Sequence, residues 1–242
     1  MTSGDTKQLR VVVTGAAGRI GTVVRERLGA RWQLIATDIA PRPGVQPLDV
    51  TAAAACEHAF AGADAVVHLA ANPDPEAEWR HLQEPNIEGA FVVAEAVRRC
   101  QVPRLVLASS LHAVSAYDGD RQRRSDDPPL PANIYGATKA WAEALGSWVA
   151  ATSSTSVVAL RIGFFSETPP SGRDLTPRNL SAWLSHHDCA ELIRAAVETD
   201  VNDFTIVSGI SANRHRIAEL GANESRIGYR PVDDAWRHLD DG

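Results

Sequence analysis

Tyr135 and Lys139, in the pentapeptide YGATK, are the residues of this chain whose types and spacing point most directly to chemistry. On a helix, side chains four residues apart lie on one face, so the Lys ammonium can approach the Tyr phenol. A phenol with an ordinary pKa of about 10 is a poor base at neutral pH. A neighbouring positive charge stabilises the phenolate and lowers that pKa. The pair is therefore predicted to accept a proton from a substrate hydroxyl.

Ser110 supplies a third polar group, directly after the apolar, strand-like run Leu105–Ser109. Its hydroxyl could hydrogen-bond the reacting oxygen, whereas Ser109 should point into the sheet because successive strand residues alternate sides. His112 follows two residues later, either facing the substrate or packed internally. We predict Ser110, Tyr135 and Lys139 to be the catalytic residues.

The glycine-rich stretch VVVTGAAGRIG follows one strand and opens an amphipathic helix, which is the context of a dinucleotide-binding turn. Gly15 permits the tight turn, Gly18 the close approach of the pyrophosphate, and Gly21 the packing of helix on strand. Asp38 ends the next strand, where its carboxylate can accept hydrogen bonds from both ribose hydroxyls and repel a 2′-phosphate. The predicted cofactor is NAD.

Apolar, strand-like runs alternate with segments of helical period along the chain. Strands are expected at 9–13, 34–37, 65–70, 105–109, 157–161 and 204–207, and helices at 19–28, 52–60, 86–99 and 186–199. This alternation predicts an α/β fold with a doubly wound parallel sheet. Residues 165–180 are too polar for a core element. We expect one NAD-binding domain over 1–242, with a small C-terminal cap and substrate-binding elements mainly in 165–242.

Composition excludes several classes of function. A chain of 242 residues suits one domain, and a formal net charge of −6 argues against a nucleic-acid partner. No apolar run is long enough to span a bilayer, so no membrane partner is expected. The expected location is the cytoplasm. Self-association into a homo-oligomer stays open.

Two polar clusters could suggest further sites. Ser185-His-His-Asp188 contains metal-ligand types, but its spacing also fits a capping box that opens a helix, and no other residues complete a metal site. We predict no metal. Arg121–Arg124 runs directly into Asp126 and Asp127, and is predicted to be a solvated loop.

The spacing TGxxGxxG, together with the Ser–Tyr–Lys set, resembles the extended short-chain dehydrogenase/reductases. The resemblance implies reversible hydride transfer at a carbon that bears oxygen. It also implies that Asp49-Val50 borders the adenine, and that the HLAA segment lies beside the phosphates and the nicotinamide-side ribose. The cofactor-binding residues are then expected to be Gly15, Ala17, Gly18, Arg19, Ile20, Gly21, Asp38, Asp49, Val50, Leu69, Ala70, Ala71, Asn86, Tyr135 and Lys139.

Within that superfamily the chain looks most similar to the uronate dehydrogenases. The similar stretches are ASSLHAV at 108–114, IYGATKAWAEAL at 134–145, LRIGFFSETPP at 160–170, RNLSAWLSHHDCAELI at 178–193 and IGYRPVDDA at 227–235. This implies NAD-dependent oxidation at C1 of a hexuronate, such as glucuronate or galacturonate, to an aldarolactone. Arg178 would hold the substrate carboxylate. The substrate-binding residues are then expected to be Asn72, Ser110, His112, Tyr135 and Arg178.

The chain also departs from the uronate dehydrogenase pattern. Leu111 stands where those enzymes carry Asn, Asn72 stands where they carry Ser, and the loop before Arg178 holds a second arginine, Arg173. The alternatives are therefore a C1 dehydrogenase of a neutral or phosphorylated aldose, a sugar epimerase or reductase, and a non-catalytic NAD-binding protein.

Overall fold

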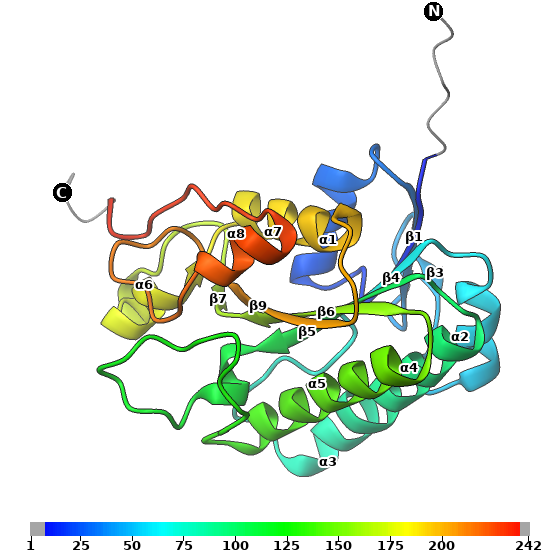
Figure 1. Cartoon of the computed structure of the whole chain (residues 1–242), viewed down its shortest axis with the longest axis horizontal. Coiled ribbons are helices and arrows are strands. Elements are labelled where there is room, and N and C mark those ends of the chain that lie inside the picture. Colours follow the sequence, from blue (N-terminus) through cyan, green and yellow to red (C-terminus); the bar gives the residue numbers. More distant parts are fainter. Residues whose placement is uncertain (1–7, 238–242) are drawn as a thin grey trace, which may run out of the picture.

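The computed structural model describes residues 8–237 and is built on a sheet of seven parallel strands (Figure 1). The strand order is β3-β2-β1-β4-β5-β6-β9. The strands are β1 Arg10–Thr14, β2 Gln33–Asp38, β3 Gln46–Pro47, β4 Ala65–His68, β5 Arg104–Ser110, β6 Ser156–Ile162 and β9 Phe204–Gly209. The order reverses between β1 and β4, the switch point at which doubly wound sheets bind ligands. The predicted fold class is confirmed.

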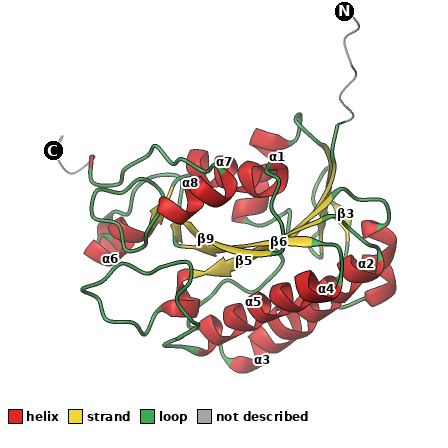
Figure 2. Cartoon of the chain, in the orientation of Figure 1, coloured by secondary structure: helices red, strands yellow, loops and turns green. Residues whose placement is uncertain are grey.

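Helices cover both faces of the sheet (Figure 2). One face carries α1 Arg19–Leu28, α7 His186–Glu198 and α8 Gly221–Ile227, and the other α2 Ala53–Phe60, α4 Gly89–Arg99 and α5 Ile134–Thr152. Along β1, Val11 and Val13 join the apolar core under α1 and α7, and Val12 joins the core under α2, α4 and α5. Burial on both faces explains why the strands read as continuous apolar runs. No helix between residues 8 and 237 is both long and apolar enough to cross a membrane.

The expected helix at 86–99 is shorter than predicted. A short helix, α3 Trp79–Leu82, leads into a π-helical segment, Gln83–Glu88, and regular α-helix begins only at Gly89. Pro85 lies in this segment and has no N–H to donate, so an unbroken α-helical ladder cannot pass through it.

The segment expected to lack core elements also differs from prediction. It holds a short 3-10 helix, Gly172–Asp174, and α6 Pro177–Ala182, and it lies between the short paired strands β7 Phe164–Phe165 and β8 Trp183–Leu184. The side chain of Thr176 caps the N-terminus of α6, and Pro177 occupies its first turn. Both are favoured helix-start residues, so a polar sequence still forms a helix here.

The Ser185-His-His-Asp188 segment opens α7 as predicted, but only half of the capping box forms. The Ser185 hydroxyl accepts a hydrogen bond from the Asp188 backbone N–H at 3.0 Å. The Asp188 carboxylate does not return to Ser185 and instead accepts backbone N–H groups from Val232 and Asp233, both at 3.0 Å. His187, Asp188 and Asp233 do lie close together, but the Asp188 carboxylate is engaged in holding the C-terminal segment.

A buried ion pair joins α5 to the centre of the sheet. Glu143 on α5 receives two hydrogen bonds from Arg161 on β6, at 2.8 and 2.9 Å, and one from the Ser109 hydroxyl on β5 at 2.6 Å. The side chains of Glu143 and Arg161 are 4% and 1% exposed. Arg161 also donates to the backbone carbonyls of Arg124 and Asp127, so one charged pair ties a helix, two strands and a loop together.

Replacing Glu143 by Ala should destabilise the protein strongly, because it leaves the Arg161 guanidinium buried without its counter-charge. Loss of one partner of a buried pair costs about 3–5 kcal/mol. Equilibrium urea unfolding would measure the change, with Glu95→Ala as the control, since Glu95 pairs with Arg98 and Arg99 at the surface. An exposed pair is worth at most about 1 kcal/mol. Equal destabilisation by the two variants would contradict this role of Glu143.

Candidate active site

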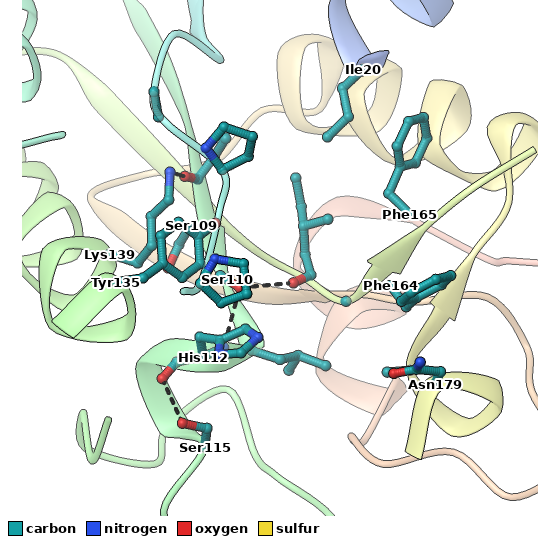
Figure 3. Close-up of a pocket in the computed structure, with 18 of the residues that line it drawn as sticks. Ile20, Ser109, Ser110, His112, Ser115, Tyr135, Lys139, Phe164, Phe165 and Asn179 are labelled. Carbon is teal, nitrogen blue, oxygen red and sulfur yellow. Dashed lines mark hydrogen bonds between the residues drawn. The ribbon is translucent and has the colours of Figure 1, made fainter. Parts of the chain in front are cut away.

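The three predicted catalytic side chains come together at the carboxyl end of β5 (Figure 3). Ser110 is the last residue of that strand, while Tyr135 and Lys139 lie on the first turns of α5. Helix α5 can start this close to the strand end because position 136 is glycine: a Cβ there would stand 2.3 Å from the His112 carbonyl oxygen. As expected, Ser109 points away, to Glu143.

The ionisation of Tyr135 differs from the prediction. Burial raises the pKa of the Tyr135 phenol, and the hydrogen bond with Ser110 and the charge of Arg19 offset only part of this effect. The neighbouring Lys139 was expected to lower that pKa. Its Nζ lies 5.6 Å from the centre of the Tyr135 ring and donates a hydrogen bond to the Ala108 carbonyl at 3.0 Å. In the protein alone, desolvation of the phenolate therefore outweighs the positive charges around it.

Lys139 is buried, and burial lowers the pKa of its ammonium to about 8. The same charge acts on His68 at the end of β4, and burial together with Lys139 lowers the pKa of that ring to about 3. His68 is therefore neutral, and its Nδ1 lies 2.8 Å from the Thr14 hydroxyl. Lys139 is the cation buried beneath this end of the sheet.

His112 lies beside the catalytic side chains, on the 3-10 turn Leu111–Val114. Its ring packs edge-on against Tyr135 with 5.5 Å between ring centres, and its backbone N–H donates to the Ser110 hydroxyl at 3.2 Å. The Asn133 amide nitrogen lies 3.1 Å from Nδ1 of the ring. Burial and the charge of Arg178 lower the pKa of His112, which keeps the ring neutral at physiological pH.

These groups face a cavity of about 380 Å³, here called the tyrosine cavity. Ser110, His112 and Tyr135 form one wall, and Ile20, Phe164, Phe165 and Asn179 form the opposite one (Figure 3). Its lining is Arg19, Ile20, Leu69, Ala71, Pro73, Pro75, Ala108, Ser109, Ser110, Leu111, His112, Ser115, Arg123, Tyr135, Lys139, Ile162, Gly163, Phe164, Phe165, Arg178, Asn179, Ala182 and Ile217. Among these residues are three arginines and no carboxylate, so the cavity favours an anionic ligand.

A second cavity, the glycine-loop cavity, adjoins the first at Leu69 and Ala71. It is lined by Gly15, Asp38, Ile39, Leu48, Asp49, Val50, Thr51, Leu69, Ala70, Ala71, Asn72, Arg80, His81, Glu84 and Pro85. Gly15 has φ +70°, and a Cβ there would stand 2.5 Å from the Ala70 backbone nitrogen. Helix α1 begins beside it with no side-chain cap, which leaves backbone N–H groups for a phosphate.

Asp38 is oriented for the role that was predicted for it. Its two carboxylate oxygens accept one backbone N–H each, from Ala17 at 2.9 Å and Ala40 at 2.8 Å. The remaining lone pairs of both oxygens stay available to ribose hydroxyls. The residues present at this end of the sheet thus fit the adenosine and pyrophosphate of NAD.

The other predicted residues fall into three groups. Asp49, Val50, Leu69, Ala70 and Ala71 line the glycine-loop cavity, Arg19 and Ile20 line the tyrosine cavity, and Ala17, Gly18 and Gly21 lie in the turn and first helical residues beside them. Asn72 lines the glycine-loop cavity rather than the tyrosine cavity. Asn86 is buried behind it and hydrogen-bonds the Asn72 backbone and the Thr138 hydroxyl.

Sequence reasoning missed Arg123, which was placed in a solvated loop. Arg121 and Arg124 are exposed as expected, but Arg123 is buried and lines the tyrosine cavity. Its backbone exchanges hydrogen bonds with Ile217 and Glu219. No local pattern around residue 123 could have shown a pairing with a segment so distant in the sequence.

Comparisons with known proteins agree with this geometry. The model of the NAD dependent epimerase/dehydratase family matches residues 11–203. The L-arabinose 1-dehydrogenase (NAD(P)(+)) of Haloferax volcanii is 36% identical, over 93% of this chain and 97% of its own. The NAD-dependent glucose-6-phosphate dehydrogenase of the same organism is 33% identical, over 93% and 94%. The crystal structure of uronate dehydrogenase from Agrobacterium tumefaciens superposes with a TM-score of 0.85 at 31% identity, over 96% of this chain and 89% of that one.

The chain belongs to the NAD-dependent epimerase/dehydratase family, the extended short-chain dehydrogenase/reductases. Within it, the chain is an NAD-dependent sugar dehydrogenase similar to the uronate dehydrogenases. The expected family and cofactor are confirmed, and a variant of the Agrobacterium enzyme has been solved with NAD.

Replacing Tyr135 by Phe should lower kcat by roughly 10²–10⁴, the usual contribution of a general base. Phe keeps the ring packing against His112, so NAD affinity should stay at the native value in a fluorescence titration. Tyr117→Phe is the matched control, because that phenol bonds the Pro128 carbonyl outside the tyrosine cavity. Turnover should also increase with pH through the neutral range in the native enzyme, since the phenolate is the accepting form and burial raises its pKa. Near-native turnover of Tyr135→Phe would overturn this assignment.

Proposed function

We propose that this dehydrogenase oxidises C1 of a hexuronate, such as glucuronate or galacturonate, to the corresponding aldarolactone. The observation that carries the proposal is the layout of the tyrosine cavity. Ser110 and Tyr135 line it together with Arg178, and no carboxylate from residues 8–237 lines it. A sugar acid needs this combination, a proton acceptor for the C1 hydroxyl and a cation for the carboxylate.

The chain's own residues divide the chemistry between them. In this scheme Ser110 and Tyr135 hold the C1 hydroxyl, and Tyr135 takes its proton as C1 becomes a carbonyl. Bound NAD supplies the hydride acceptor. Lys139 keeps a positive charge beneath the site, which favours the anionic phenol as the proton arrives. Phe164 and Phe165 cover the opposite wall and limit the access of water.

Arg178 is the residue we propose to bind the carboxylate. It lies in the first turn of α6, is exposed, and makes no hydrogen bond or ion pair with any residue of the described chain. A planar guanidinium can hold a carboxylate through two parallel hydrogen bonds. Such a grip at the far end of the sugar would orient C1 toward Tyr135.

The name of the L-arabinose 1-dehydrogenase supports oxidation at C1, but the relatives together point to more than one sugar. By name, one acts on L-arabinose, one on glucose 6-phosphate and one on uronates. Leu111 also stands where the uronate dehydrogenases are expected to carry Asn. A neutral or phosphorylated aldose is therefore the second candidate substrate.

The Arg178→Ala variant tests the anionic substrate. We expect kcat/KM on glucuronate to fall roughly ten- to a hundredfold, the value of a hydrogen-bonded charge, with little change on glucose. Arg173→Ala is the matched control, because Arg173 is exposed in the same segment and lines neither cavity. NAD reduction followed at 340 nm measures both. Equal losses on glucuronate and glucose would remove the hexuronate and favour the neutral aldose.

A further inference from the structure

The Arg123 side chain lines the tyrosine cavity and is held by hydrogen bonds to two backbone carbonyls. Its Nη1 donates to the Arg121 carbonyl at 3.0 Å and its Nη2 to the Tyr117 carbonyl at 2.9 Å. The residue is only 7% exposed. Two tethers leave three of the five guanidinium N–H groups unassigned.

No carboxylate in the described part of the chain forms an ion pair with Arg123, and Asp127 and Asp118 attract its charge only from beyond ion-pair distance. The neighbouring Arg121 and Arg124 pair with Asp127 and Asp126. The nearby positive charge of Arg178 adds to the cost of burying this guanidinium. Two cations close together, one of them buried, are unfavourable unless an anion joins them.

The tyrosine cavity does not end at these two arginines. Arg123 and Arg178, with Ser115 and Ile217, also line an adjoining cleft, here called the arginine cleft. Arg121, His215 and Arg216 also line this cleft, with one carboxylate, Asp120. The cavity that holds the sugar therefore continues between two guanidinium groups into a largely basic space. A single carboxylate at C6 would not need that space.

We propose that Arg123 and Arg178 form a subsite for a phosphoryl group at the end of the sugar remote from C1, so that aldose 6-phosphates are substrates of this enzyme. The inference rests on the proposed C1 oxidation and widens its substrate class. A carboxylate offers two oxygens and one charge, which the single fork of Arg178 satisfies. A phosphoryl group offers three oxygens and up to two charges, which suit two guanidinium groups. The arginine cleft provides room for its third oxygen and its water.

The test compares glucose 6-phosphate, glucuronate and glucose as substrates of the native enzyme, Arg123→Gln and Arg124→Gln. Native kcat/KM should be at least about tenfold higher on glucose 6-phosphate than on glucose. Arg123→Gln should lose about tenfold or more on glucose 6-phosphate and far less on glucuronate. Arg124→Gln removes the same charge from the same loop but outside both cavities, and should leave all three values unchanged.

Inorganic phosphate gives a second readout that needs no variant. It should inhibit the native enzyme competitively with glucose 6-phosphate, and more weakly in Arg123→Gln. Equal losses on the two anionic sugars would mean that Arg123 only supports the loop, and would overturn the subsite. Oxidation of glucuronate with no preference for glucose 6-phosphate over glucose would overturn it while the proposed function stands. Failure to oxidise any of the three sugars at C1 would overturn both.

Discussion

The buried ion pair between Glu143 and Arg161 is the constraint on which the rest of the site depends. Its two side chains are almost completely buried, so α5 can approach β5 and β6 only in the register that lets them meet. That register places Lys139 and Tyr135, about one and two turns earlier on α5, against the end of β5 where Ser110 lies. Arg161 also holds the carbonyls of Arg124 and Asp127, and thereby the loop that carries Arg123. The same pair thus fixes the predicted catalytic groups and the loop that carries Arg123.

Two kinds of group line the tyrosine cavity: the predicted proton-transfer residues and the arginines proposed to bind the substrate. At the strand ends, an enclosed phenol and an enclosed ammonium make a proton acceptor whose ionisation depends strongly on its surroundings. Arg178 on α6 and Arg123 beside residues 217–219 supply positive charge and take no part in proton transfer. The NAD-binding elements lie on the other side, at the switch point between β1 and β4. In the proposed function, a sugar held between the two parts presents only one end to Tyr135, and the two arginines select which sugars are held.

Local patterns in the sequence predicted most of this structure. Strand runs buried on both faces, the glycine turn before α1 and the Tyr–Lys spacing each depend on residues close together in the chain, and each was found where expected. Features that depend on distant segments were not predictable. The burial of Arg123 follows from its pairing with residues 217–219, and the raised pKa of Tyr135 follows from packing that no pentapeptide specifies. The π-helical segment around Pro85 was missed because π- and α-helices share residue preferences, and the short helix α6 was missed because its sequence is polar.

Transfer of an isotopic label tests the central claim, oxidation at C1 of an anionic sugar, most directly. Glucuronate that carries deuterium at C1 would be incubated with the native enzyme and NAD, and the mass of the reduced cofactor determined. Glucuronate deuterated at C4 is the matched control, because an epimerase acting at C4 would draw its hydride from there. We predict that the reduced cofactor gains one deuterium from the C1-labelled sugar and none from the C4-labelled sugar. Deuterium from C4, or reduced cofactor without label from C1, would contradict the assignment.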